Sequence, residues 1–197
     1  MNKPNYSIEF AIAVCIFVFC LLCAIPKFTY AADTVLWDSL RSGESIALMR
    51  HTIAPGTGDP PEFMLGDCNT QRNLSSEGRD QAMRIGARLR ENGIHTARVF
   101  SSQWCRCLDT ARLLELDAVA ELTIINSFFQ QYENREPQTQ ALREWITAQN
   151  PDDPLILVTH QVNITALTGI YPSSGEMVII RRAGGVELEV VGTIKTD

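Results

Sequence analysis

The sequence lacks the excess of basic residues that binding to nucleic acid requires. Its 197 residues include 17 Lys and Arg against 23 Asp and Glu, a net charge of −6, so it offers no basic face to a phosphate backbone. It also contains no internal repeat, no low-complexity tract and no long linker. These absences argue against a nucleic-acid-binding protein and predict one domain of ordinary size, over residues 33–197.

A long hydrophobic run is also missing, apart from one near the N-terminus. The run AIAVCIFVFCLLCAI at 11–25 is shorter than the roughly 20 residues that a membrane-spanning helix needs. Lys3 precedes this run, Pro26 follows it, and small residues that suit cleavage lie at 31–32. The pattern predicts a signal peptide over residues 1–32 and an exported protein, periplasmic or secreted, that meets a membrane only through this segment. An uncleaved N-terminal anchor is the alternative.

The remaining chain alternates between short apolar runs and amphipathic stretches. Strands are expected at 45–50, 97–102, 122–126 and 154–160, followed by a terminal pair at 175–182 and 184–192. Helices are expected from Ser75 or Ser76 to Asn92-Gly93, across 108–116, at 136–151 and at 163–169. Strands that alternate with helices predict the α/β class, here a three-layer α/β/α sandwich with a mostly parallel central sheet.

Polar residues follow three of these strands at the point where each strand ends. They are the pairs Arg50-His51, Ser101-Ser102 and Thr159-His160. In parallel sheets, ligands bind beyond the carboxyl ends of the strands. The sequence therefore predicts a binding or catalytic site at this edge of the sheet.

Three segments at these strand ends resemble the motifs of the histidine phosphatase superfamily, which has the phosphoglycerate-mutase-like fold. They are LMRHT at 48–52, SSQWCRCLDTA at 101–111 and LVTHQ at 157–161. The leader and the segment DCNTQRNLS at 67–75 make the chain most similar to the secreted bacterial branch. That branch includes enzymes that act on phosphorylated lipopolysaccharide core sugars. The resemblance implies a phosphatase for a phosphorylated small molecule or envelope glycan.

The same resemblance implies a role for each motif residue. His51 becomes the nucleophile that accepts the phosphoryl group, Arg50 and Arg106 bind its oxygens, and His160 is the second imidazole that contacts it. The chemistry agrees, because a neutral imidazole can attack phosphorus and guanidinium groups stabilise the charge on the equatorial oxygens. Neither a metal nor a cofactor is expected. A zinc site from both histidines with Cys105 and Cys107 is disfavoured, because Cys-x-Cys is not the usual chelating spacing.

The general acid for the leaving group is not evident from the sequence. Gln161 stands where one family branch carries Asp, and residues 127–129 occupy the region where another carries Glu. Glu133, Asp67 and Asp59 remain as candidates. A substrate with a good leaving group, such as an acyl phosphate, sugar 1-phosphate, phosphoanhydride or phosphohistidine, needs less help from an acid. A non-catalytic domain that binds phosphate or a phosphorylated glycan is the alternative to an enzyme.

Three cysteines remain once the leader is set aside, and disulfides persist in exported proteins. In this fold the first loop, which carries Cys68, passes over the strand ends near Arg106. We therefore expect a disulfide from Cys68 to Cys105 or Cys107, with Cys105 slightly favoured. A Cys105–Cys107 bridge would be strained, and three reduced thiols are the remaining alternative.

Overall fold

The computed structural model describes residues 28–149 and 152–196. The predicted signal peptide therefore lies, up to residue 27, outside the described residues. The chain divides into two units, Met1–Thr34 and Val35–Asp197, and all strands of the described residues belong to the second. Within the described ranges, no helix is long and apolar enough to cross a bilayer.

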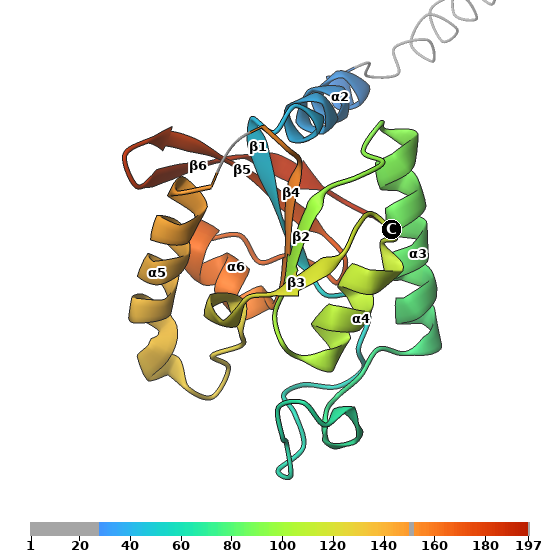
Figure 1. The fold of residues 1–197 in the computed structure, drawn as a ribbon, viewed down its shortest axis with the longest axis vertical. Coiled ribbons are helices and arrows are strands. Elements are labelled where there is room, and N and C mark those ends of the chain that lie inside the picture. The colour runs from blue at the N-terminus through green and yellow to red at the C-terminus, as the bar shows by residue number, and fades with distance from the viewer. Residues whose placement is uncertain (1–27, 150–151, 197) are drawn as a thin grey trace, which may run out of the picture. The chain divides into compact units, whose positions relative to one another are not determined.

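One mixed sheet of six strands forms the centre of the second unit (Figure 1). The strands are β1 (Ser45–Arg50), β2 (Arg98–Ser101), β3 (Val119–Glu121), β4 (Leu155–Thr159), β5 (Met177–Gly184) and β6 (Glu187–Ile194), in the order β3-β2-β4-β1-β5-β6. The first four in this order run parallel, whereas β5 is antiparallel to both β1 and β6. The prediction of an α/β fold with a mostly parallel sheet is confirmed.

Helices cover both faces of this sheet. They are α2 (Phe28–Arg41), α3 (Ser76–Glu91), α4 (Cys105–Leu113), α5 (Arg135–Thr147) and α6 (Gln161–Thr168), with short 3-10 turns at Cys68–Thr70, Thr123–Ile125 and Tyr132–Asn134. Side chains of α3 and α4 enter one core cluster, and those of α5 and α6 enter the other. Figure 1 shows α3 with α4 on one side of the strands and α5 with α6 on the other.

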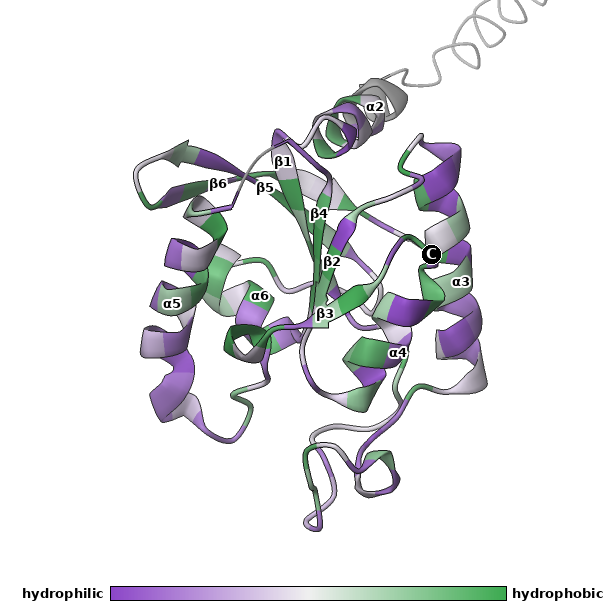
Figure 2. Cartoon of the chain, in the orientation of Figure 1, coloured by the Kyte–Doolittle hydropathy of each residue, from purple (hydrophilic) through white to green (hydrophobic). Residues whose placement is uncertain are grey.

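The central strands β1 and β4 are apolar on both faces. Ala47 and Met49 face the cluster under α3 and α4, whereas Ile46 and Leu48 face the cluster under α5 and α6. Such strands read as continuous apolar runs because no side of them meets water. Figure 2 shows this as hydrophobic strands at the centre, with hydrophilic residues on the outer helices.

Helix α3 has the ends that the sequence predicts. The Ser75 side chain caps it by accepting a hydrogen bond from the Gly78 amide, and Asn92 closes it. A Cβ atom on Gly78 would lie 2.0 Å from the Ile53 carbonyl oxygen. Only glycine lets the helix approach the chain after β1 so closely, and this contact helps to set the first loop.

Two parts of the predicted secondary structure are wrong. The expected strand at 122–126 is displaced, because β3 covers only Val119–Glu121 and Thr123–Ile125 is a 3-10 turn. Ile125 is fully buried in the core, so the apolar run there reflects burial of a turn rather than pairing of a strand. Helix α2 was not predicted from the sequence, although its side chains of Leu36, Trp37 and Leu40 are all buried.

A disulfide joins Cys68 to Cys105, 37 residues apart. It is the favoured one of the two predicted pairings. Cys107 is a buried free cysteine. The bond ties the first loop to the start of α4, next to Arg106.

Breaking this disulfide should lower the free energy of unfolding by about 3–4 kcal/mol, because a closed loop of this length limits the unfolded chain. Urea unfolding with and without reductant measures the difference, and the double variant Cys68→Ser/Cys105→Ser is the control. Reductant should shift the unfolding midpoint of the wild type and leave that of the double variant unchanged. Equal shifts in both proteins would show that the bond does not stabilise the fold.

Candidate active site

A cavity of about 640 Å³ opens at the carboxyl ends of β1 and β4. Its lining includes Arg50, His51, Arg106 and His160. Arg50 ends β1, His51 follows it, Arg106 lies in the first turn of α4, and His160 precedes α6. The structure thus brings the four motif residues to one place, at the sheet edge that the sequence indicated.

His51 is held in one tautomer by its own backbone. The residue is 3% exposed, and its Nδ1 lies 2.7 Å from the Thr52 carbonyl oxygen. A carbonyl can only accept, so Nδ1 carries the proton and Nε2 keeps its lone pair. Burial lowers the pKa of His51 well below its usual value, and the positive charge of Arg106 lowers it further. His51 is therefore a neutral imidazole with an unprotonated Nε2.

His160 lies beside His51, with 5.6 Å between ring centroids. Its Nε2 is 2.8 Å from the Ser102 hydroxyl, and its Nδ1 is 3.5 Å from Nη2 of Arg106. Burial, followed by the charge of Arg106, lowers the pKa of His160 well below its usual value. Both histidines are thus neutral imidazoles.

A short chain of hydrogen bonds sets the tautomer of His160. The Asn126 amide donates to the Gln103 side chain at 2.8 Å, so its Oδ1 is the end that accepts from Ser102, at 3.2 Å. Because the single hydroxyl proton of Ser102 goes to Asn126, the hydroxyl accepts the Nε2 proton of His160. The lone pair of His160 is therefore on Nδ1, beside Arg106.

Arg106 is 2% exposed and binds the carboxylate of Asp59 with two parallel hydrogen bonds, of 2.6 and 3.1 Å. Asp59 also accepts from the Trp104 indole at 3.0 Å and from the Arg72 amide at 3.1 Å. Burial by itself raises the pKa of Asp59, but the hydrogen bonds and charge of Arg106 outweigh it and lower the pKa. Asp59 is thus ionised and fixes the plane of Arg106.

Two further arginines line the cavity. Arg50 donates through Nη1 to the Pro172 carbonyl at 2.9 Å, and Arg72 donates through Nε to the Gly58 carbonyl at 2.7 Å. Burial, followed by the charge of Arg106, lowers the pKa of Arg72 to about 10, so it stays protonated at neutral pH. Among the described residues, the Nε atoms of Arg50 and Arg106 are buried without an acceptor. Three guanidinium groups in one cavity can donate hydrogen bonds to the oxygens of a phosphoryl group.

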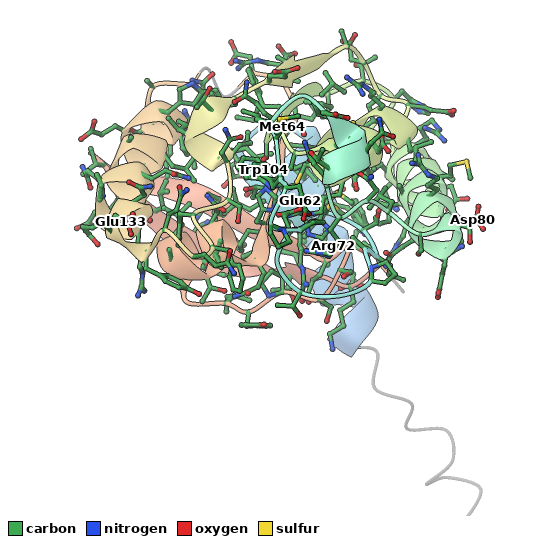
Figure 3. The ribbon with its side chains drawn as sticks, turned by 90° about the horizontal axis from the view of Figure 1, so that it is seen from below. Glu62, Met64, Arg72, Asp80, Trp104 and Glu133 are labelled. Atoms are coloured by element: carbon green, nitrogen blue, oxygen red, sulfur yellow. A yellow bond between two sulfur atoms is a disulfide. The ribbon has the colours of Figure 1, made fainter. Side chains whose placement is uncertain are left out.

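The candidate general acids lie in three different environments. Asp59 lines the cavity but is ionised against Arg106. Asp67 accepts from the Asn69 amide and caps the 3-10 turn that follows it. Glu133 is exposed near the start of α5, and Figure 3 places it at the edge of the molecule, away from Trp104. None of the three is a free carboxyl group in the cavity.

Arg72, Trp104 and Asn126 were not predicted as site residues, whereas Ser102 belongs to one of the three polar pairs predicted at this edge. Arg72 and Trp104 lie inside quoted segments, QRNLS and SSQWCR, so their place in these segments was the available signal. No sequence signal marked Asn126 as a site residue, because it lies in the segment that was predicted as a strand. Within the described ranges, no group of three or more His, Cys, Asp or Glu is placed to hold a metal ion. Cys105 is excluded as a zinc ligand because it is in the disulfide.

This chain is similar in sequence to one protein family and similar in fold to several solved structures. Residues 46–138 match the family model described as the histidine phosphatase superfamily (branch 1). A mycobacterial glucosyl-3-phosphoglycerate phosphatase is 18% identical, covering 75% of this chain and 97% of its own, with a TM-score of 0.53. A search of curated protein sequences gave no match.

Two further solved structures share the fold. A putative phosphohistidine phosphatase from Agrobacterium tumefaciens is 15% identical, covering 78% of this chain and 98% of its own, with a TM-score of 0.51. A phosphoserine phosphatase from Entamoeba histolytica is 11% identical, covering 77% and 97%, with a TM-score of 0.55. At these identities the likeness concerns the fold.

Proposed function

We propose that the chain is a member of the histidine phosphatase superfamily, whose family model matches residues 46–138, and that it hydrolyses phosphate monoesters through a phosphohistidine at His51. The observation that carries the proposal is the unprotonated Nε2 of a neutral His51 in a cavity lined by Arg50, Arg72 and Arg106. A nucleophile with a free lone pair and fixed cations for the phosphoryl oxygens are the two requirements of such a transfer.

The reaction has two steps. In the first, the Nε2 lone pair forms a bond to phosphorus, and the phosphorus–oxygen bond to the leaving group breaks with its electron pair on oxygen. In the second, water attacks phosphorus, the nitrogen–phosphorus bond breaks, and inorganic phosphate leaves. His160 carries a lone pair on Nδ1 in the same cavity, and we assign it to accept a proton from the attacking water.

Among the described residues that line the cavity, no protonated carboxyl group is placed to donate a proton to the leaving oxygen. Asp59, the carboxylate that lines the cavity, is ionised against Arg106. We therefore propose that the substrates are esters with weakly basic leaving groups, among them sugar 1-phosphates of the cell envelope. Export through a signal peptide over residues 1–32 is part of the proposal, and the Cys68–Cys105 disulfide supports it, because such bonds are rare in the cytosol.

Hydrolysis of aryl phosphates tests this function. We expect p-nitrophenyl phosphate to be hydrolysed with a kcat/KM at least roughly tenfold above that of phenyl phosphate, because the two phenols differ by about three pKa units and receive no proton from the protein. Steady-state kinetics on both esters measures the ratio.

Equal kcat/KM values would mean that a group of the protein protonates the leaving oxygen. A folded protein that binds inorganic phosphate but hydrolyses neither ester would identify the alternative, a phosphate-binding domain. The observation that favours this alternative is that the described lining residues include no free carboxyl group.

A further inference from the structure

The charges that line the cavity balance one phosphoryl dianion and nothing more. Arg50, Arg72 and Arg106 contribute three positive charges, and Asp59 contributes one negative charge. Among the described lining residues there is no Lys and no other Asp or Glu, and both histidines are neutral. Two positive charges therefore remain, which a phosphate monoester dianion cancels. A second anionic group on the substrate would find no unpaired cation in the cavity.

The rest of the lining combines aromatic rings with uncharged polar side chains, among them Gln130, Gln131 and Gln161. The ring of Phe63 stacks on Trp104, with 5.0 Å between centroids and 20° between planes. Phe129 and Tyr171 also line the cavity and are partly exposed, 37% and 72%. Rings of this kind pack against other rings, aromatic or sugar, with a gain from buried area. A carboxylate placed against them would lose its hydration without gaining a partner.

One acidic residue lies at the rim of the cavity. Glu62 is exposed, and both of its neighbours, Pro61 and Phe63, line the cavity. Figure 3 shows Glu62 in the same part of the molecule as Arg72 and Trp104. Its carboxylate adds a repulsive contribution for any second anionic group that reaches the rim.

We propose that this cavity selects phosphate monoesters whose organic part is an uncharged ring, a sugar or an aryl group, over monoesters that carry a second anionic group. The inference rests on the proposed function, because it takes the cavity as the active site of a phosphatase. It goes further by assigning specificity to the charge balance of the arginines and to the rings of Trp104 and Phe129.

A matched pair of substrates separates charge from shape. The esters 4-(carbamoylmethyl)phenyl phosphate and 4-(carboxymethyl)phenyl phosphate have the same size and nearly the same leaving group, and they differ by one negative charge. We expect kcat/KM to be at least roughly tenfold higher for the amide, with the ratio falling as salt is added, because salt screens the repulsion from Glu62. Equal values, or a faster acid, would overturn the proposal.

Variants test the aromatic part. Phe129→Ala should raise KM for the amide ester several-fold and leave KM for acetyl phosphate, which has no ring, unchanged. Met83→Ala removes a side chain of similar exposure, 43% against 37% for Phe129, from α3 and outside the cavity, and should change neither value. Equal effects of Phe129→Ala on both substrates would contradict the proposed ring contact.

Binding distinguishes failure of the inference from failure of the function. If no ester is hydrolysed, titration calorimetry with the same two esters replaces kinetics. Tighter binding of the amide would then support the selectivity while refuting the phosphatase activity. Equal binding would refute both.

Discussion

Replacing His51 by alanine should abolish hydrolysis and the phosphoenzyme that rapid quenching traps with the wild type. Removal of a catalytic nucleophile lowers kcat by roughly 10⁴-fold or more, and here the lost atom is the one that bonds to phosphorus. A phosphohistidine is labile in acid and stable in base, so the trapped label should show that pattern. Quenched-flow experiments with a radiolabelled substrate measure both the label and its stability.

The chain offers a matched control for this experiment. His95 is exposed and does not line the cavity, so His95→Ala should keep full activity and full labelling. If the label survived His51→Ala, another residue would be the nucleophile, and the assignment of the two histidines would have to be reversed or abandoned.

Replacing Arg106 by alanine should lower kcat/KM by roughly 10²–10³-fold, by analogy with the loss of one oxyanion donor at about 3–4 kcal/mol. Arg106→Lys should recover only part of the activity, because an ammonium group keeps the charge and loses the planar pair of donors. Steady-state kinetics on p-nitrophenyl phosphate measures both effects.

The two substitutions also differ in their effect on folding. Arg106→Ala leaves the Asp59 carboxylate, 17% exposed, without its cation, and an unpaired, largely buried charge destabilises a protein strongly. Arg106→Lys keeps a cation for Asp59, so a loss of activity in this variant reflects the site rather than the fold.

A surface ion pair between α3 and α4 provides the control for Arg106. Arg79 binds Asp109 of α4 at 2.8 Å with both side chains partly exposed, and such pairs contribute little to stability. Arg79→Ala should therefore leave activity and stability nearly unchanged. Near-normal turnover of folded Arg106→Ala would remove Arg106 from the mechanism.

The sequence alone determined the parts of this protein that repeat or end in a regular way. A strand that is buried on both faces, such as β1 or β4, has an unbroken run of apolar residues in its sequence. Helix α3 begins and ends at the capping residues Ser75 and Asn92. Since the parallel strands all end at one edge, Arg50-His51 and Thr159-His160 could be assigned to one site without coordinates. These features are local, so their physical cause is contained in a few neighbouring residues.

Only the tertiary structure decided what the irregular segments do. Asp59 and Arg106 are 47 positions apart, and Ser102 and His160 are 58 apart, so no local pattern links either pair. The same holds for Arg72, whose loop has no periodicity, and for Cys68, whose partner the sequence left open between two neighbours. The apolar run at 122–126 was read as a strand because periodicity cannot distinguish a buried turn from a buried strand. Packing of distant segments decided each of these, and it also decided that Asp59, the carboxylate among the described lining residues, binds Arg106.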